Sequence, residues 1–304
     1  MNKQLNEVQI EDIRKLASNV RLSLGLGDDI PIANDMFSIL DRKDITLVEY
    51  PISVNGKPGF YASLTCFNTN GNKLFFLGLN TANPLDAQIF GIAHELYHYE
   101  TNTIDLPDNS SEEIKADRFA AELLLPLSSL RAWILKEFKV SSLQSVSKAR
   151  IMRFIARLQC EWWLPYRSLV RRLYEEDYIS SSQYDQLYSN DERSCTGEYG
   201  RICCAIDKDV FERLNSPTNR TGTSPRALET VIGNYEDGLI DVDNFIRGMR
   251  LLGKAPEDFS LDIEIDPEDI DEMNAYLGEG ETDKTFKGLT DQDQREFLNF
   301  IEEK

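Results

Sequence analysis

The chain contains only two histidines, and both lie in the segment His94-Glu95-Leu96-Tyr97-His98. Residues four apart on an α-helix are turned by only about 40°, so His94 and His98 can present two imidazole nitrogens to one zinc ion. Glu95 is turned about 100° from His94, which lets it reach a water molecule at the zinc without binding the metal. The spacing therefore predicts a helical zinc site capable of hydrolysis.

In such a site zinc lowers the pKa of the water, and Glu95 takes the proton as general base. The same carboxylate then delivers the proton to the leaving amine of a cleaved peptide bond. Two histidines would fall four apart around a glutamate by accident with a chance on the order of one in a thousand. The segment is therefore a specific signal for a metallopeptidase.

A catalytic zinc needs a third protein ligand, and with no further histidine this must be a carboxylate or a cysteine. Glu113 is the best candidate, because Asp117 lies one turn further along and could accept a hydrogen bond from a zinc-binding imidazole. A capping box at 110–113 competes with this interpretation, since Glu113 would then bond back to the helix start. Glu112, Cys66 or another acid remain as alternatives.

The elements that must position these residues follow from hydrophobic spacing. Apolar residues at helical intervals predict helices over 8–24, 35–40, 84–100 and 112–126. Between the second and third of these helices, three β-branched and aromatic runs (ITLVEY, GFYASLTCF and KLFFLGLN) are punctuated by Asn-Gly pairs, which predicts a small antiparallel sheet.

The second half of the chain gives weaker signals. A pair of helices is expected over 127–188, broken at Trp162-Trp163 and Pro165. The run CCAIDKDVF has strand character, and residues 225–253 predict two helices hinged near Gly238. The acidic end closes with QREFLNFIEE, and no internal repeat is visible.

Composition sets limits on the class of protein. A chain of 304 residues with 41% hydrophobic residues can fill a core, and no signal peptide or membrane-spanning run is visible, so we expect a soluble, cytoplasmic protein that does not bind membranes. Five cysteines without CxxC spacing argue against a disulfide framework, and burial as small hydrophobic residues is the simplest role for them.

The charge is strongly acidic but uneven. With 33 basic and 52 acidic residues the net charge is −19, which disfavours nucleic acid as a general partner and favours a basic protein surface. A basic stretch over 136–172 is read first as solvated helix faces. A second hypothesis makes it an activating site for single-stranded DNA, with Trp162 and Trp163 as stacking surfaces and a set of arginines as phosphate contacts (Arg150, Arg153, Arg157, Arg171 and Arg172).

Two segments together resemble the ImmA/IrrE family of metallo-endopeptidases: FGIAHELYHYE, and SSEEIKADRFAAELLLP after a loop of about a dozen residues. In that family the HExxH helix is followed by Glu-x-x-Ala-Asn/Asp-x-Phe-Ala-Ala-x-Leu-Leu-x-Pro. The resemblance implies that His94, His98 and Glu113 bind zinc and that Glu95 is the general base. Asp117 occupies the Asn/Asp position.

The resemblance also implies an α+β fold with a zincin-like metallopeptidase core at 1–126. A helical, helix-turn-helix-like segment at 127–190 would follow. The resemblance ends near residue 190. For residues 191–304 we expect a C-terminal α/β or mostly helical module, and a sensor or substrate-docking unit is the hypothesis for its role.

Members of the family cleave Xre-type helix-turn-helix repressors, which derepresses stress, mobile-element or defence operons. A broad-specificity peptidase is one alternative, and a non-proteolytic DNA- or partner-binding regulator with a structural zinc site is another. Glu95 favours catalysis, because a structural site needs no general base.

Overall fold

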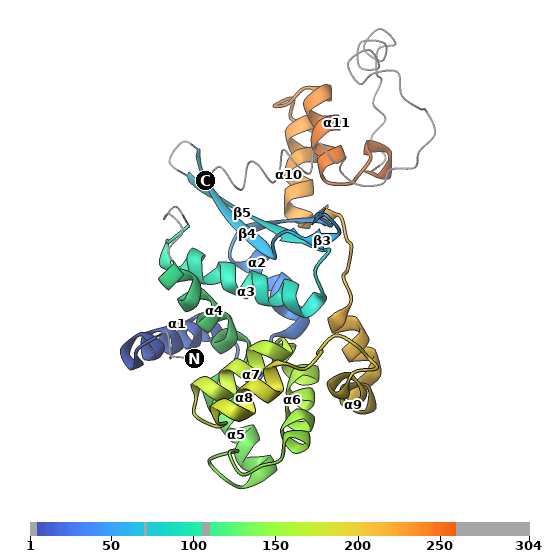
Figure 1. Ribbon diagram of the computed structural model, residues 1–304. Coiled ribbons are helices and arrows are strands. Elements are labelled where there is room, and N and C mark those ends of the chain that lie inside the picture. Colours follow the sequence, from blue (N-terminus) through green and yellow to red (C-terminus); the bar gives the residue numbers. More distant parts are fainter. Residues whose placement is uncertain (1–4, 70–71, 105–109, 260–304) are drawn as a thin grey trace.

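The protein is described by a computed structural model that covers residues 5–69, 72–104 and 110–259. In Figure 1 a small sheet lies above helix α3 (Leu85–Thr101), and a group of helices that follows α4 (Ser110–Leu124) in the chain lies below it. Helices and a small sheet in one chain make the fold α+β, as predicted.

The sheet has the strand order β4-β5-β1-β6. Strands β4 (Ala62–Thr69) and β5 (Asn72–Asn80) form an antiparallel hairpin, whereas β1 (Ile45–Tyr50) runs parallel to β5. The sheet is therefore mixed rather than purely antiparallel. The reason is the connection after β1: it passes through the short hairpin of β2 (Ser53–Val54) and β3 (Lys57–Pro58) to the outer position of β4, and β5 then fills the gap beside β1.

Helix α3 packs against β4 and β5 and so brings the HELYH segment beside the edge of the sheet. Leu77 and Leu79 of β5 and Ile89, Ile92 and Leu96 of α3 are buried in this contact region. Gly91 permits the close approach, because a Cβ at that position would lie 3.1 Å from the Cβ of Tyr61 and 3.3 Å from that of Ala62.

The predicted N-terminal helices are present as α1 (Glu7–Ser23) and α2 (Met36–Arg42), preceded by a 3-10 turn (Ala33–Asp35). Helix α4 packs against both α1 and α3. Ala116 and Ala120 of α4 are fully buried, and such small side chains let two helices approach closely.

The segment expected as a pair of helices forms four: α5 (Leu127–Phe138), α6 (Lys148–Trp162), α7 (Tyr166–Glu175) and α8 (Ser181–Tyr188). The predicted break between α6 and α7 is confirmed. Trp163 adopts a left-handed conformation (φ 55°) and Pro165 caps α7, so the chain cannot continue as one helix.

Beyond residue 190 the chain forms α9 (Glu198–Asn215), β6 (Gly222–Thr223), α10 (Pro225–Glu236), α11 (Val242–Leu251) and a 3-10 turn (Pro256–Phe259). The strand character assigned to CCAIDKDVF was wrong. These residues lie in α9, where Tyr199, Cys203 and Phe211 are buried at multiples of four residues, although Asp207 interrupts the helical backbone (φ −154°, ψ 99°).

The hinge between α10 and α11 is confirmed at Gly238, whose φ is +67°. The run QREFLNFIEE lies outside the described residues. Strand β6 pairs antiparallel with β1, so the range predicted as a C-terminal module contributes a strand to the sheet of the core. Within the part of the chain described, we find no helix that is both long and apolar enough to span a membrane.

Candidate metal centre

The structure brings the two histidines and Glu113 together. The Nε2 atom of His94 lies 3.1 Å from one carboxylate oxygen of Glu113, and the Nε2 atom of His98 lies 3.4 Å from the other. Helix α3 supplies the histidines and helix α4 the glutamate. The three ligand atoms lie within 4.8 Å of one another, and in the described residues this is the only group of three or more such side chains that could hold a metal ion.

The geometry fits a metal ion with tetrahedral coordination. Ligand atoms at about 2.1 Å from a tetrahedral ion are separated by about 3.4 Å, close to the distances observed here. Both Nδ1 atoms are engaged elsewhere: that of His94 lies 3.1 Å from Asp117 Oδ1, and that of His98 lies 2.9 Å from Thr103 Oγ1. Partners on Nδ1 leave the Nε2 lone pairs to face the metal position.

Glu112, the alternative ligand, is engaged in other contacts. Its carboxylate accepts hydrogen bonds from the Tyr97 hydroxyl at 2.8 Å and from Lys115 Nζ at 2.6 Å. The bond from Lys115 outweighs burial and, with the bond from Tyr97, lowers the pKa of Glu112. Cys66 of β4 is likewise outside the ligand group of the described residues. Glu113 is therefore the third member of the group.

Glu95 lies beside this group and is held by the sheet. The backbone N–H of Leu64 in β4 donates a hydrogen bond of 3.1 Å to Glu95 Oε2. Burial raises the pKa of Glu95 to about 7, and the neighbouring His94 and the Leu64 N–H oppose this rise only in part. A carboxyl group with such a pKa can both accept and return a proton near neutral pH.

The two histidines differ in their electrostatics. Burial works to lower the pKa of His94, but the hydrogen bond that its Nδ1 donates to Asp117 and the charges of Glu95, Asp117 and Glu113 raise it above its usual value. Burial and the nearby His94 lower the pKa of His98. Of the two histidines, His94 is the one that contacts Asp117.

The comparison with known families agrees with this geometry. Residues 40–160 match a peptidase family described as the IrrE N-terminal-like domain. This part of the chain belongs to that family. The match covers Glu95 and all three members of the ligand group, and it supports a metallopeptidase. None of the curated proteins matches the chain.

A cleft of about 710 Å³ opens beside the metal centre of the IrrE N-terminal-like domain. His94, Glu95 and Glu113 line it. The segment 59–62 before and at the start of β4 contributes to it, and so do Arg167, Ser168 and Arg171 of α7. Sequence reasoning missed these lining residues, because their approach depends on tertiary packing and leaves no spacing signal.

The hydroxyls of Tyr97 and Tyr99 both contact other protein groups. The Tyr97 hydroxyl donates to Glu112 as described, and the Tyr99 hydroxyl donates to the carbonyl of Lys43 at 3.1 Å. The Tyr99 ring also meets Phe75 edge-on at 4.8 Å between centroids. Both hydroxyls are therefore committed to contacts outside the ligand group.

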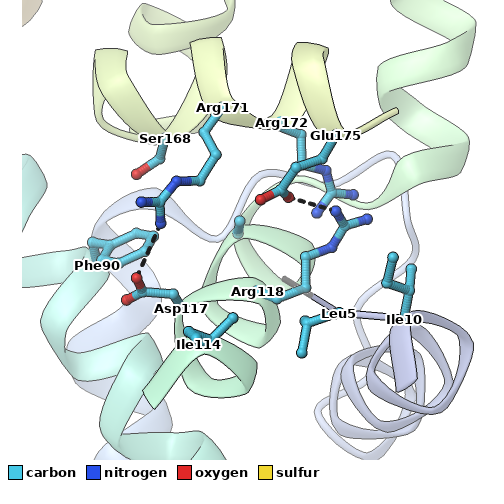
Figure 2. Close-up of a pocket in the computed structure, with 11 residues that line it drawn as sticks. Leu5, Ile10, Phe90, Ile114, Asp117, Arg118, Ser168, Arg171, Arg172 and Glu175 are labelled. Carbon is cyan, nitrogen blue, oxygen red and sulfur yellow. Dashed lines mark hydrogen bonds and ion pairs between the residues drawn. The ribbon is translucent and has the colours of Figure 1, made fainter. Parts of the chain in front are cut away.

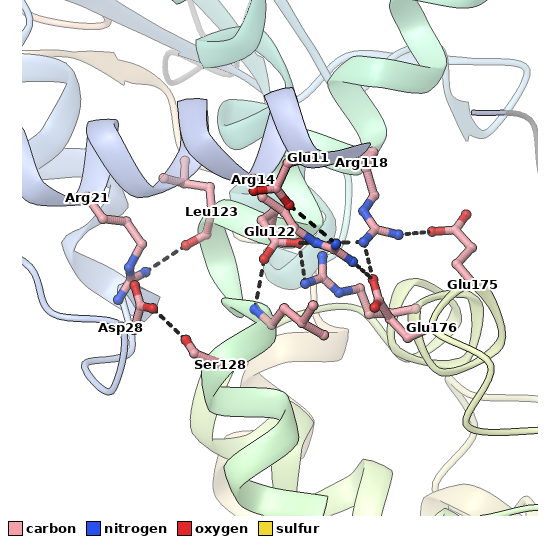
Figure 3. A network of polar contacts seen from close by, with 12 residues as sticks. Glu11, Arg14, Arg21, Asp28, Arg118, Glu122, Leu123, Ser128, Glu175 and Glu176 are labelled. Atoms are coloured by element: carbon pink, nitrogen blue, oxygen red, sulfur yellow. Dashed lines mark hydrogen bonds and ion pairs between the residues drawn. The ribbon is translucent and has the colours of Figure 1, made fainter. Parts of the chain in front are cut away.

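Several cations of the basic stretch at 136–172 are neutralised by internal contacts. Arg172 is 1% exposed and pairs with Glu122, Arg171 pairs with Asp117, and Arg157 pairs with Glu137. Figure 3 shows the pairing around Glu122. Trp162 and Trp163 are 1% and 8% exposed. The two tryptophans and Arg172 are therefore too buried for the stacking and phosphate contacts that single-stranded DNA binding requires, whereas Arg150 and Arg153 are exposed.

Proposed function

We propose that the chain is a zinc-dependent endopeptidase that cleaves an Xre-type helix-turn-helix repressor and so derepresses a stress, mobile-element or defence operon. The observation that carries the hydrolytic part is the convergence of His94, His98 and Glu113 beside Glu95, whose carboxylate is fixed by the Leu64 N–H. A structural zinc site would have no use for a general base at this position.

The residues present fit zinc in donor type and separation. Held by His94, His98 and Glu113, zinc would supply a Lewis acid that activates water and polarises the carbonyl of the scissile bond. Glu95 removes a proton from the attacking water. As the protonated acid it then passes this proton to the amine that leaves. The Leu64 N–H keeps one oxygen of Glu95 in place during both transfers.

The repressor as target rests on the family resemblance and on charge. A net charge of −19 favours association with a basic, DNA-binding protein. The cleft beside the metal centre has the size of a site for a few residues, so the cut bond should lie in an extended segment of the repressor. Because repressors act on DNA, we place the reaction in the cytoplasm.

The direct test is incubation of the zinc-loaded chain with the helix-turn-helix repressor encoded beside its gene. Wild type should produce a discrete cut, whereas Glu95→Gln should bind zinc and leave the repressor intact. Glu112→Gln is the matched control, because it removes a nearby carboxylate that lies outside the ligand group, and it should retain cleavage. Equal cleavage by Glu95→Gln would refute the assignment of the base.

The same incubation distinguishes the proposed site-specific peptidase from the two alternative functions. Wild type that binds zinc and the repressor but leaves it intact, with and without DNA, would favour the non-proteolytic alternative. Cleavage of many unrelated unfolded proteins at similar rates would favour a broad-specificity peptidase instead.

A further inference from the structure

Asp117 divides its carboxylate between two partners on different elements. Its Oδ1 lies 3.1 Å from His94 Nδ1, and its Oδ2 lies 3.2 Å from Nη1 of Arg171 in α7. Figure 2 shows the Arg171 side chain reaching down from α7 to Asp117. The Asp117 side chain is 41% exposed, so the packing around it leaves room for other rotamers. Arg171 supplies the contact that selects one of them.

Arg171 is itself held in place. Its guanidinium also lies near the Tyr184 hydroxyl of α8, where it partly offsets the rise that burial causes in the pKa of Tyr184. Next to it, α7 is fastened to α4 by a group of ion pairs drawn in Figure 3. Arg118 contacts Glu175 at 2.7 Å and also Glu176, and the buried Arg172 contacts Glu122.

We propose that Arg171 is a positioning residue of the metal centre. By fixing Asp117, it keeps the proton of His94 on Nδ1 and the lone pair of Nε2 directed at the metal position. Arg171 lies outside the range 40–160 that matches the family, so the segment after that range would complete the site. The inference rests on the proposed metal-binding function.

The direction in which zinc affinity changes on removal of Arg171 distinguishes a positioning role from a simple charge effect. A positive charge near a bound cation weakens cation binding, so if Arg171 acted only through its charge, its removal would tighten metal binding. If it acts by orienting Asp117, its removal weakens binding despite the favourable loss of positive charge. The two explanations therefore predict opposite changes in affinity.

The experiment measures the zinc Kd of metal-free protein by competition with a chelator for wild type and three variants. Loss of a direct partner of a metal-binding histidine costs about 10- to 100-fold in affinity, so Arg171→Met, one step further out, should weaken binding by about 3- to 10-fold. Arg171→Gln keeps a donor and should weaken it less. Arg157→Met removes a guanidinium of α6 that pairs with Glu137 and lies outside the cleft, and it should leave the zinc Kd unchanged.

Two further readouts exclude a general structural effect. The absorption spectrum of the Co²⁺-substituted Arg171→Met protein should differ from that of wild type, while its thermal unfolding temperature should stay near that of Arg157→Met. In Asp117→Ala, the added Arg171→Met change should have no further effect on zinc affinity, because the link to His94 is already broken.

Unchanged or tighter zinc binding by Arg171→Met would overturn the inference, and so would a full, additive loss in the double variant. Failure of the wild type to bind zinc would instead refute the proposed metal centre. The two failures are therefore distinguishable in one set of titrations.

Discussion

At the residue scale, two adjacent glutamates at the start of α4 have different partners. Glu113 directs both carboxylate oxygens at the histidines, whereas Glu112 is bonded to Tyr97 and Lys115. Successive residues on a helix are turned by about 100°, which separates the two side chains. The difference in direction between two neighbouring helix positions thus decides which glutamate can bind metal.

This difference gives a prediction about metal affinity. Glu113→Gln replaces a charged ligand with a neutral amide and should weaken zinc binding by about 100-fold or more, a loss of about 3 kcal/mol. Glu112→Gln should change it by less than about threefold. Titration of both metal-free variants against a zinc chelator measures the difference, and equal losses in the two would contradict the assignment of Glu113.

The sequence was sufficient for the residues whose relation is local. The arrangement of His94, Glu95 and His98 follows from helical spacing alone. The need for a third ligand favoured Glu113 with Asp117 one turn further on, and the family pattern pointed to the same two residues. The hydrogen bonds of Leu64 to Glu95 and of Arg171 to Asp117 link residues 31 and 54 positions apart. Hydrogen bonds from a backbone N–H and from a distant arginine produce no spacing pattern in the sequence, so only the tertiary structure reveals them.

At the scale of elements, the attachment of α7 to α4 depends on buried charges. Burial works to raise the pKa of Glu176, but the guanidinium groups of Arg118, Arg172 and Arg14 lower it below its usual value. The Glu176 side chain is only 8% exposed. Removing one partner of such a buried group leaves charges uncompensated, which typically costs about 3 kcal/mol or more.

We therefore expect Glu176→Gln to lower the free energy of unfolding by about 3 kcal/mol at pH 7. A depressed pKa in the folded state stabilises the protein above the unfolded value of about 4.3, and this stabilisation is lost as the pH falls through the lower folded value. Urea unfolding from pH 7 to pH 3 should show the gap between wild type and variant narrowing below about pH 4.5. A gap that stays constant over this range would contradict the role of the Glu176 charge.

The prediction of helices was most successful where the hydrophobic pattern extended over several turns, and it failed for one short run. Helices α1, α3 and α4 carry apolar residues over several turns, and each was predicted. The run CCAIDKDVF is too brief for its period to separate strand from helix, and α9 forms because its apolar side is buried. The parallel pairing of β1 with β5 depends on where β4 lies, which no local pattern encodes.

At the scale of the whole molecule, residues 216–224 tie the C-terminal half to the sheet. The carbonyl of Ser216 accepts the N–H of Leu85 at 3.1 Å, at the start of α3. The N–H of Asn219 donates to Thr81 at 3.0 Å, and the N–H of Ser224 donates to Leu47 at 3.1 Å. Helix α9, which precedes this segment, packs against α6 and α3.

These contacts predict that a chain ending at residue 190 is not an independent peptidase unit. It would lose the backbone bonds of 216–224, each worth about 1 kcal/mol, and the buried side chains of α9, each worth about 2 kcal/mol. Together these amount to a loss of more than about 5 kcal/mol, comparable with the whole stability of a domain. We expect the shortened chain to unfold at much lower urea concentration or to aggregate through the uncovered edge of β1.

A chain ending at residue 259 is the matched control, because it keeps every one of these contacts, and it should unfold at a higher urea concentration than the chain ending at 190. If the chain ending at 190 were equally stable and bound zinc with the same affinity, α9 and the segment 216–224 would form a separable module. If it is unstable, the metal centre depends on both halves of the chain, since Leu85 begins the helix that carries His94 and His98.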